Sequence, residues 1–408
     1  MSLHIKNCRS CKSRKIVNLF TLGKIRFTGK FPKFKEKIPH GELNLTMCKV
    51  CKLVQLKDIF NMSYLYNKDY GYRTGINATM SEHVKSVVKK ISKISKLKNG
   101  DNVLDIASND GTLLKNYNNK VITWGIDPIL IKFSKEYKKI NYKISNFFNY
   151  KLVLKKNIKV KFKIITALSV FYDLKNPNTF LNGIKKLLHY NGIFYLEFQD
   201  LMMIIKHNMF DTICHEHLEY YSVTFINKLL KEHDLRIFDH SYNDINGGSS
   251  AYLICHNTAR YKTKKNKINQ ILLKEKKFGI EKISTYKKFK KRIDLMKKKL
   301  NLKIKKIVKN KKTIHGYAAS TKGNVLLQYY NLDNRNIKFI SDRNPRKFNL
   351  YTPGSNIKII SETESRRLNP DYYLVLAWHF KKEILSREKI IRKKGTKFIF
   401  PLPNIKII

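Results

Sequence analysis

Residues 102–111 read NVLDIASNDG, and this stretch decides the expected fold class. Residues 102–106 predict a short apolar strand with Asp105 near its end, followed by a tight turn of small residues and a helix from Leu113. This order of elements opens a doubly wound α/β fold that binds nucleotides. As a fingerprint the turn is weak, because it holds one glycine, Gly111, where three are usual.

The next strand, VITWGID, supports the same interpretation and ends in Asp127, 22 residues after Asp105. An acidic side chain at this place can accept hydrogen bonds from ribose hydroxyls. Two acids at the ends of neighbouring strands therefore predict adenosine binding. The alternative for Asp127 is a cap at the N-terminus of the following helix.

Two further segments are expected at the same edge of the sheet. The strand KIITA (residues 163–167) runs into LSVFYDL (residues 168–174), which should stand at the carboxyl edge, where such folds bind ligands. A helix over residues 178–188 leads to the strand IFYLEF, in which Glu197 interrupts an apolar run and is either paired or functional. The stretch DTICHEHLEYY (residues 211–221) follows and should hang over this edge.

Residues 211–221 concentrate side chains that exchange protons near neutral pH. His215 and His217 flank Glu216, and an extended backbone would put the histidines on one face and the glutamate on the other. All three are candidates for acid–base catalysis. A hydrogen-bonded network at a domain edge, or part of a metal site, would use the same residue types.

Two CxxC pairs, Cys8–Cys11 and Cys48–Cys51, lie near the start of the chain. Four thiolates close a tetrahedral structural zinc site, and the long gap between the pairs requires an inserted hairpin or loop. Disulfides are the alternative, and they fit poorly with an intracellular chain. His4 and His40 could each replace a thiolate.

The segment Tyr64–His83 is dense in tyrosine and passes into an amphipathic helix expected over residues 80–97. Its tyrosines either pack a domain junction or place phenol groups beside a sugar or an enolate. The sequence favours neither for Tyr64, Tyr66, Tyr70 and Tyr72.

The chain of 408 residues is long enough for two or three domains, and its net charge of +53 is typical of nucleic-acid-binding proteins. The excess is mostly Lys and is spread along the whole length, however, and Lys recognises phosphates and bases less specifically than Arg. We therefore expect nonspecific, salt-sensitive adhesion to polyanions and attraction of a diphosphate-bearing substrate, but no specific nucleic-acid partner.

No apolar run approaches the length of a membrane span, and the N-terminus lacks the apolar core of a signal peptide. These observations predict a cytoplasmic protein with reduced thiols and no membrane partner.

The last third of the chain predicts a long helix and a second α/β unit. Residues 262–312 are rich in Lys and place Ile293, Met296, Leu300, Ile304 and Ile307 in one stripe, which is typical of a packed helix with a solvated lysine face. From Thr313 a strand, a turn over residues 318–324, a helix and further strands follow. Lys322, with Ser320 and Thr321, is suited to a diphosphate, although such loops are also ordinary turns.

Together these segments resemble the S-adenosylmethionine-dependent C-methyltransferases that act on nucleotide-linked keto-sugars. The resemblance runs nearly from end to end and rests on long stretches in the family's order: CxxC…CxxC, YGYRTGIN, VLDIASNDGTLL, GIDP, SVFYDL, FDTICHEHLEYYS, NDINGGS, GYAASTKGNVLLQYY, SDRNPRKFNLYTPG and DYYLVLAWHF. It implies a zinc-binding domain (residues 1–62), a Rossmann-like class I methyltransferase domain (63–256), a helical linker (257–312) and a C-terminal Rossmann-like domain for the nucleotide-sugar (313–408).

The resemblance also implies roles for individual residues. His217 would be the general base, Glu216 would position or stabilise, and His215 and Tyr72 would stand near the sugar. S-adenosylmethionine would bind at Asp105, Ala107, Ser108, Asn109, Asp110, Gly111 and Asp127. The substrate would bind at Ser320, Thr321, Lys322, Asn324 and Arg343, and structural Zn²⁺ at Cys8, Cys11, Cys48 and Cys51.

The sequence departs from the family's pattern at two places. Ala107 stands where glycine is usual, and its methyl group would approach the cofactor's carboxypropyl end. Cys214 stands where the best-described members have tyrosine before HEH, so that a phenol hydrogen bond to the sugar would be lost.

Our interpretation is a zinc-stabilised C-methyltransferase that forms an enolate of a nucleotide-linked keto-deoxysugar. One alternative is an O-methyltransferase of a sugar or small metabolite, with His217 deprotonating a hydroxyl. Another is a lysine-rich nucleic-acid-binding protein with a vestigial methyltransferase domain. The identity of the sugar, the methylated position and the oligomeric state stay open.

Overall fold

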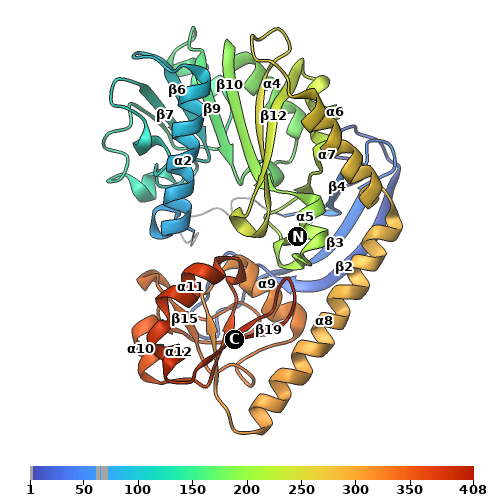
Figure 1. The fold of residues 1–408 in the computed structure, drawn as a ribbon, viewed down its shortest axis with the longest axis vertical. Coiled ribbons are helices and arrows are strands. Elements are labelled where there is room, and N and C mark those ends of the chain that lie inside the picture. The colour runs from blue at the N-terminus through green and yellow to red at the C-terminus, as the bar shows by residue number, and fades with distance from the viewer. Residues whose placement is uncertain (1–2, 61–64, 66–71) are drawn as a thin grey trace.

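Three larger sheets organise the computed structural model of the chain, which describes residues 3–60, 65 and 72–408 (Figure 1). Tyr64, Tyr66 and Tyr70 lie outside the described residues. A mixed seven-stranded sheet and a mostly parallel six-stranded sheet each carry helices, and a four-stranded antiparallel sheet lies beside them. The α/β fold class expected from the sequence is confirmed.

The N-terminal sheet is antiparallel and has the strand order β11-β4-β3-β2. Strands β2 and β3 form the hairpin that the gap between the CxxC pairs requires, and a short strand pair, β1 and β5, lies beside them. The strands of this part are β1 (Leu3–His4), β2 (Ile16–Arg26), β3 (His40–Cys48), β4 (Val54–Leu56), β5 (Asp58–Ile59) and β11 (Glu219–Tyr220). The fourth strand, β11, comes from the stretch that carries the histidines, far along the chain.

The central sheet has the order β12-β13-β10-β9-β6-β7-β8, with strands β6 to β10 parallel and β13 antiparallel to both of its neighbours. Its strands are β6 (Asn102–Ile106), β7 (Ile122–Ile126), β8 (Tyr142–Ile144), β9 (Phe162–Leu168), β10 (Leu188–Gln199), β12 (Leu235–Asn243) and β13 (Ser249–His256). The helices of this region are α2 (Ala78–Ser95), α3 (Tyr150–Lys156), α4 (Pro177–Leu187), α5 (Leu201–Lys206), α6 (Val223–Lys231) and α7 (Lys265–Phe278).

Local signals in the sequence set the ends of α2. The side chain of Asn77 accepts a hydrogen bond from the Met80 amide and caps the first turn, and Lys96 ends the helix in a left-handed conformation. The helix buries an apolar stripe against the sheet, so that the predicted amphipathic helix is confirmed, two residues earlier than expected.

The prediction of a helix from Leu113 is wrong. Only a single 3-10 turn, Leu114–Asn116, follows the strand and turn. The Asn116 amide donates to the carbonyls of Thr112 and Leu113, at 2.8 and 3.4 Å, and such side-chain bonds compete with helix propagation.

The C-terminal sheet has the order β16-β15-β14-β17-β18-β19 and is parallel except for the last strand. Its strands are β14 (Ile314–Tyr317), β15 (Ile340–Asp342), β16 (Ile359–Ser361), β17 (Tyr372–Val375), β18 (Lys397–Phe400) and β19 (Lys406–Ile407). Its helices are α9 (Thr321–Tyr330), α10 (Glu362–Arg367), α11 (Lys381–Arg387) and α12 (Lys389–Lys393).

One long helix, α8 (Ile283–Lys309), runs along the side of the molecule from the central part to the C-terminal part (Figure 1). All five residues of the predicted stripe are buried in it, which confirms the packed face. No helix in the described part of the chain combines the length and the apolar character that crossing a membrane requires.

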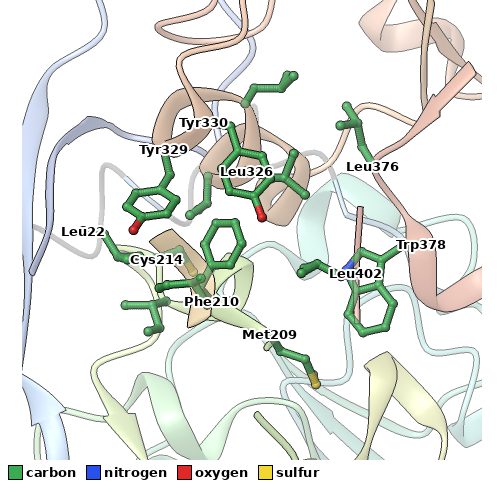
Figure 2. Close-up of a cluster of buried hydrophobic side chains, with 14 of the residues drawn as sticks. Leu22, Met209, Phe210, Cys214, Leu326, Tyr329, Tyr330, Leu376, Trp378 and Leu402 are labelled. Atoms are coloured by element: carbon green, nitrogen blue, oxygen red, sulfur yellow. The ribbon is translucent and has the colours of Figure 1, made fainter. Parts of the chain in front are cut away.

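A single apolar cluster joins the N-terminal, central and C-terminal parts (Figure 2). At its middle the Phe210 ring lies 4.9 and 5.1 Å from the rings of Tyr329 and Tyr330 on α9. Cys214 is buried in this cluster and does not line the cavity described below. Cys214 is thus a packing residue here, in agreement with the expectation that the sugar contact of a tyrosine at this position is lost.

Candidate active site

A cavity of about 500 Å³ opens between the carboxyl edge of the central sheet and the C-terminal part. Its walls come from all three parts of the molecule: Gly29 and Phe31, the ends of strands β6, β7 and β9, and the loop after β14. Ligands of doubly wound folds bind at this edge of the sheet, so that the location agrees with the expectation from the strand pattern.

The acids at the ends of β6 and β7 both line the cavity. Asp127 accepts hydrogen bonds from the amides of Asn109 (2.9 Å) and Ile129 (2.8 Å), and Asp105 accepts one from the Thr166 hydroxyl (2.6 Å). Burial raises the pKa of Asp105 to about 7 and that of Asp127 to about 6. Asp127 thus holds the following turn and still faces the cavity, and its contact with a ribose stays a prediction.

Only part of the turn after β6 lines the cavity, and the rest of the turn packs behind it. Ala107, Ser108 and Asn109 line the cavity, and Ala107 has a φ of 57°, a left-handed conformation that costs an alanine about 1–2 kcal/mol. Asp110 and Gly111 do not line it, and their assignment to the cofactor stays a prediction. A side chain at Gly111 would meet the Tyr137 ring at 3.3 Å, so this glycine provides room for packing.

Asp110 instead holds the segment that follows the tyrosine-rich stretch. Its carboxylate accepts hydrogen bonds from Arg73 Nε and the Gly75 amide, both at 3.0 Å. The Thr74 amide donates to Asn109 Oδ1 at 3.0 Å. These contacts fasten the segment over the turn, where Tyr72 lines the cavity and stays 46% exposed.

The HEH stretch is a tight turn and not an extended strand. Glu216 and His217 consequently line the cavity together, whereas an extended backbone would have placed them on opposite faces. His215 faces the N-terminal sheet: its Nε2 lies 3.3 Å from the Gly41 carbonyl, and its ring packs on Phe27 and Phe60. The structure therefore does not bring His215 into the cavity with Glu216 and His217.

The surroundings of His217 fix its tautomer. Its Nδ1 lies 2.7 Å from the Thr212 carbonyl, which can only accept, so that Nδ1 carries the proton and Nε2 has a free lone pair. The Tyr172 ring packs against the imidazole with centroids 4.1 Å apart. Burial, together with the nearby Lys322 ammonium, lowers the pKa of His217 to about 3. The geometry is that of a neutral base.

Glu216 is a buried carboxyl group, and burial raises its pKa. The Thr28 hydroxyl donates to its Oε2 at 3.5 Å. A side chain on Gly29 would come within 2.6 Å of Oε1, so this glycine allows the backbone to approach the carboxyl group closely.

The stretch is held from both sides by main-chain hydrogen bonds. The Leu56 amide of β4 donates to the Leu218 carbonyl (2.9 Å), and the Leu218 amide donates to the Tyr172 carbonyl (2.8 Å). Directly afterwards β11 pairs with β4, with Glu219 opposite Gln55. The position of His217 is therefore set by the N-terminal sheet on one side and by the loop after β9 on the other.

The loop after β14 supplies the far wall of the cavity. Ser320 caps α9 by accepting from the Gly323 amide (3.0 Å), and Ser320, Thr321 and Lys322 line the cavity. Arg343 also lines it, 3.5 Å from Glu383. Asn324 does not, because its amide is buried and donates to the Thr28 carbonyl at 2.8 Å. The structure therefore does not bring Asn324 to the cavity with the other residues predicted for the substrate.

Asp342, at the end of β15, repeats the arrangement of Asp127. Its carboxylate accepts hydrogen bonds from the Ala319 amide in the loop after β14 (2.7 Å) and from the Asn344 amide in the turn after β15 (2.8 Å). Asp342 also lines the cavity. The Lys347 ammonium donates to the Ala319 carbonyl nearby at 2.7 Å. Sequence reasoning missed Asp342, although it ends the second strand of its unit as Asp127 does. It also missed Lys347 and Tyr172.

The four cysteines of the CxxC pairs form one cluster. Their sulfur atoms all lie within 4.8 Å of one another, with Cys8–Cys51 and Cys11–Cys48 both at 3.5 Å. Four thiolates around tetrahedral Zn²⁺, with Zn–S bonds of about 2.3 Å, stand about 3.8 Å apart. The cluster fits structural zinc, as the spacing predicts, and these four residues would hold the ion.

Comparison with known proteins identifies three family domains in order. Residues 8–66 match a zinc-binding domain, residues 76–240 a methyltransferase domain, and residues 244–403 a C-methyltransferase C-terminal domain. The chain is 27% identical to the C-methyltransferase NovU of Streptomyces niveus over 415 residues, which cover 99% of this chain and 97% of NovU.

Two solved structures are similar to part of the chain. An S-adenosylmethionine-dependent methyltransferase from Clostridium acetobutylicum is 15% identical and covers 43% of this chain and 92% of its own, with a TM-score of 0.36. The magnesium protoporphyrin IX methyltransferase of Synechocystis is 14% identical and covers 44% of this chain and 88% of its own, with a TM-score of 0.33.

The zinc cluster should stabilise the strand next to the candidate base. Cys48→Ser should reduce the bound zinc from about one equivalent and expose the amides of β4 and β11 to hydrogen exchange, because β4 begins directly after Cys51. Strands β6 and β9 should keep their protection. Elemental analysis and hydrogen-exchange mass spectrometry measure both effects. Cys255→Ser, in the central sheet, is the matched control, and unchanged protection of β11 in zinc-free protein would contradict the prediction.

The imidazole of His217 should stay neutral and in one tautomer across the working pH range. With a pKa of about 3, it gains a proton only as the pH falls below about 4. Spectra of protein with ¹⁵N-labelled histidine, assigned with the His217→Gln variant, should show a protonated Nδ1 and an unprotonated Nε2. A titration of this signal near pH 6.5 would refute the assignment.

Proposed function

Because the chain belongs to the C-methyltransferases that join these three domains, we propose that it transfers the methyl group of S-adenosylmethionine to a carbon of a nucleotide-linked keto-deoxysugar. The observation that carries this proposal is one cavity in which the strand-end acids of the central sheet, the neutral His217 and the loop of the C-terminal unit face one another. A two-substrate transfer needs both partners in one space beside a base.

The central sheet would hold the methyl donor. Asp127 would accept hydrogen bonds from the ribose hydroxyls, and Asp105 with the turn at Ala107 would face the amino-acid end of the donor. When bound, S-adenosylmethionine supplies a methyl group on a cationic sulfur. Ala107 has a left-handed backbone conformation, and the cavity stays open beside its methyl side chain.

The C-terminal unit would hold the nucleotide of the substrate. Asp342 stands where Asp127 stands in the central sheet, and Ser320 and Thr321 lie at the N-terminus of α9, where anions are favoured. Lys347 and Arg343 would add positive charge for the diphosphate. The sugar ring would then extend towards His217 on the opposite wall.

His217 would perform the proton transfer that carbon methylation requires. A proton next to a ketone is acidic enough to be removed by a neutral imidazole, and Nε2 of His217 is the atom available to accept it. The Thr212 carbonyl would hold the Nδ1–H and stabilise the imidazolium that forms. Glu216 and the Tyr72 phenol, on the same cavity wall, would position the sugar.

The proposed reaction predicts exchange of a C–H proton before methyl transfer. Protein, keto-sugar substrate and the demethylated donor in heavy water should incorporate deuterium next to the ketone, because proton removal does not require the methyl group. His217→Gln should slow this exchange and methyl transfer by about 10²–10⁴-fold, the contribution of a positioned base. Mass spectrometry with a panel of nucleotide-linked keto-sugars, followed by NMR of the product, measures both.

His215→Gln is the matched control for His217→Gln. It should lower the stability of the protein and leave the exchange mechanism intact. Methylation at oxygen, without any deuterium incorporation, would replace the proposal with the O-methyltransferase alternative.

Asp127→Asn should weaken S-adenosylmethionine binding by about 1.5–3 kcal/mol, the range for hydrogen bonds to a charged group. The asparagine keeps one acceptor oxygen for the surrounding loop amides, so the zinc content should not change. Asp342→Asn, the equivalent change in the C-terminal unit, is the control and should leave this affinity unaltered. Calorimetry is the measurement, and an equal affinity in Asp127→Asn would reduce Asp127 to a support of the turn.

A further inference from the structure

The side chain of Lys322 turns away from the site that its sequence position indicates. It lies in the first turn of α9, yet its ammonium group donates to the Asn246 carbonyl in the central part, at 3.2 Å. The N-terminus of α9 thus has Ser320 and Thr321 beside it, while the charge of Lys322 lies across the cavity.

A chain of hydrogen bonds connects this ammonium group to the candidate base. The Gln199 side-chain amide donates to the same Asn246 carbonyl at 2.8 Å, and the other end of Gln199 accepts from the Thr212 hydroxyl. Thr212 in turn accepts the Nδ1–H of His217 through its carbonyl. Lys322 and His217 therefore belong to one hydrogen-bonded network, and both line the same cavity.

The charges around Lys322 leave room for an anion. None of the ion pairs within 4 Å among the described residues includes it. Asp211, the carboxyl group whose charge acts on it, is buried and accepts from Trp378 Nε1 at 2.8 Å. The other titratable groups that face it are His217, His379 and the Cys214 thiol. A cation held beside a base, without a carboxylate in contact, suits a negative charge that develops during the reaction.

We propose that Lys322 is a catalytic residue whose ammonium group holds the ketone oxygen of the substrate as that oxygen becomes an enolate. The proposal rests on the function proposed above. As the C–H bond breaks, its proton goes to His217 Nε2 and its electron pair forms the new C=C bond. The former carbonyl electron pair moves onto oxygen, where Lys322 donates a hydrogen bond. As the C=C electron pair attacks the methyl carbon of the donor, the methyl–sulfur bond would break with its electron pair staying on sulfur. The C=O bond would form again in the same step, and Lys322 would keep all its protons.

The alternative is that Lys322 binds the diphosphate of the substrate, and this role predicts a different effect of substituting its side chain. Positive charge beside the α9 loop also comes from Lys347 and Arg343. The Lys347 ammonium group lies at the Ala319 carbonyl and 3.6 Å from Asp342, and Arg343 lines the cavity 3.5 Å from Glu383. An enolate role changes the rate of proton exchange, whereas a diphosphate role changes the affinity for the nucleotide.

The test compares Lys322→Met with Lys347→Met in the full-length, zinc-loaded protein. Lys322→Met should slow deuterium incorporation at saturating keto-sugar by about 10²–10³-fold, the effect of removing one oxyanion donor. Its affinity for nucleoside diphosphates without a sugar (UDP, dTDP, GDP and CDP, by calorimetry) should stay within about threefold. Lys347→Met should weaken the binding of whichever of these nucleoside diphosphates binds the wild-type protein, about tenfold or more. Lys303→Met, on the exposed face of α8, should change neither quantity.

Lys322→Arg keeps the charge and should retain more exchange than Lys322→Met or Lys322→Gln. Exchange by Lys322→Met at the wild-type rate, or loss of nucleoside diphosphate affinity in that variant, overturns the proposal. Absence of exchange in the wild-type protein on every keto-sugar tested overturns the proposed function instead. Donor binding by each variant, measured separately, identifies a variant that has failed to fold, in which case the Gln and Arg variants decide.

Discussion

The pairing of β11 with β4 is the constraint on which the candidate site depends. The residues that follow His217 form the edge strand of a sheet built from the first sixty residues, so that two segments far apart in the chain must meet before the base is in place. His215 packs into this N-terminal part, and Glu216 and His217 turn into the cavity. The small zinc-binding part therefore contributes to the position of the base, besides its own stability.

The two α/β units of the chain use the same device at their ligand edges. In each, an acid at the end of the second strand accepts one amide from the loop after the first strand and one from the turn that follows it. A carboxylate that satisfies two amides fixes the loop and keeps oxygen lone pairs for a ligand. The units face each other across one cavity.

Periodicity and spacing predicted much of this structure, because those signals are local. The strands around Asp105 and Asp127, the buried stripe of α8 and the four-cysteine cluster all follow from patterns within short segments. The turn at HEH was not predictable, because pairing with a distant strand overrides the local preference of residues 214–218. The directions of Lys322, Asp110 and Asn324 were missed for the same reason, since each side chain contacts another part of the chain.

Helix α8 gives the molecule a fixed internal length. Its 27 residues, at 1.5 Å per residue, make a rod of about 40 Å that connects the central part to the C-terminal part. Removing or adding one turn would move its far end by about 5 Å and rotate the attached unit. The number of residues in α8 thus sets the distance between the two halves of the cavity, although α8 does not line that cavity.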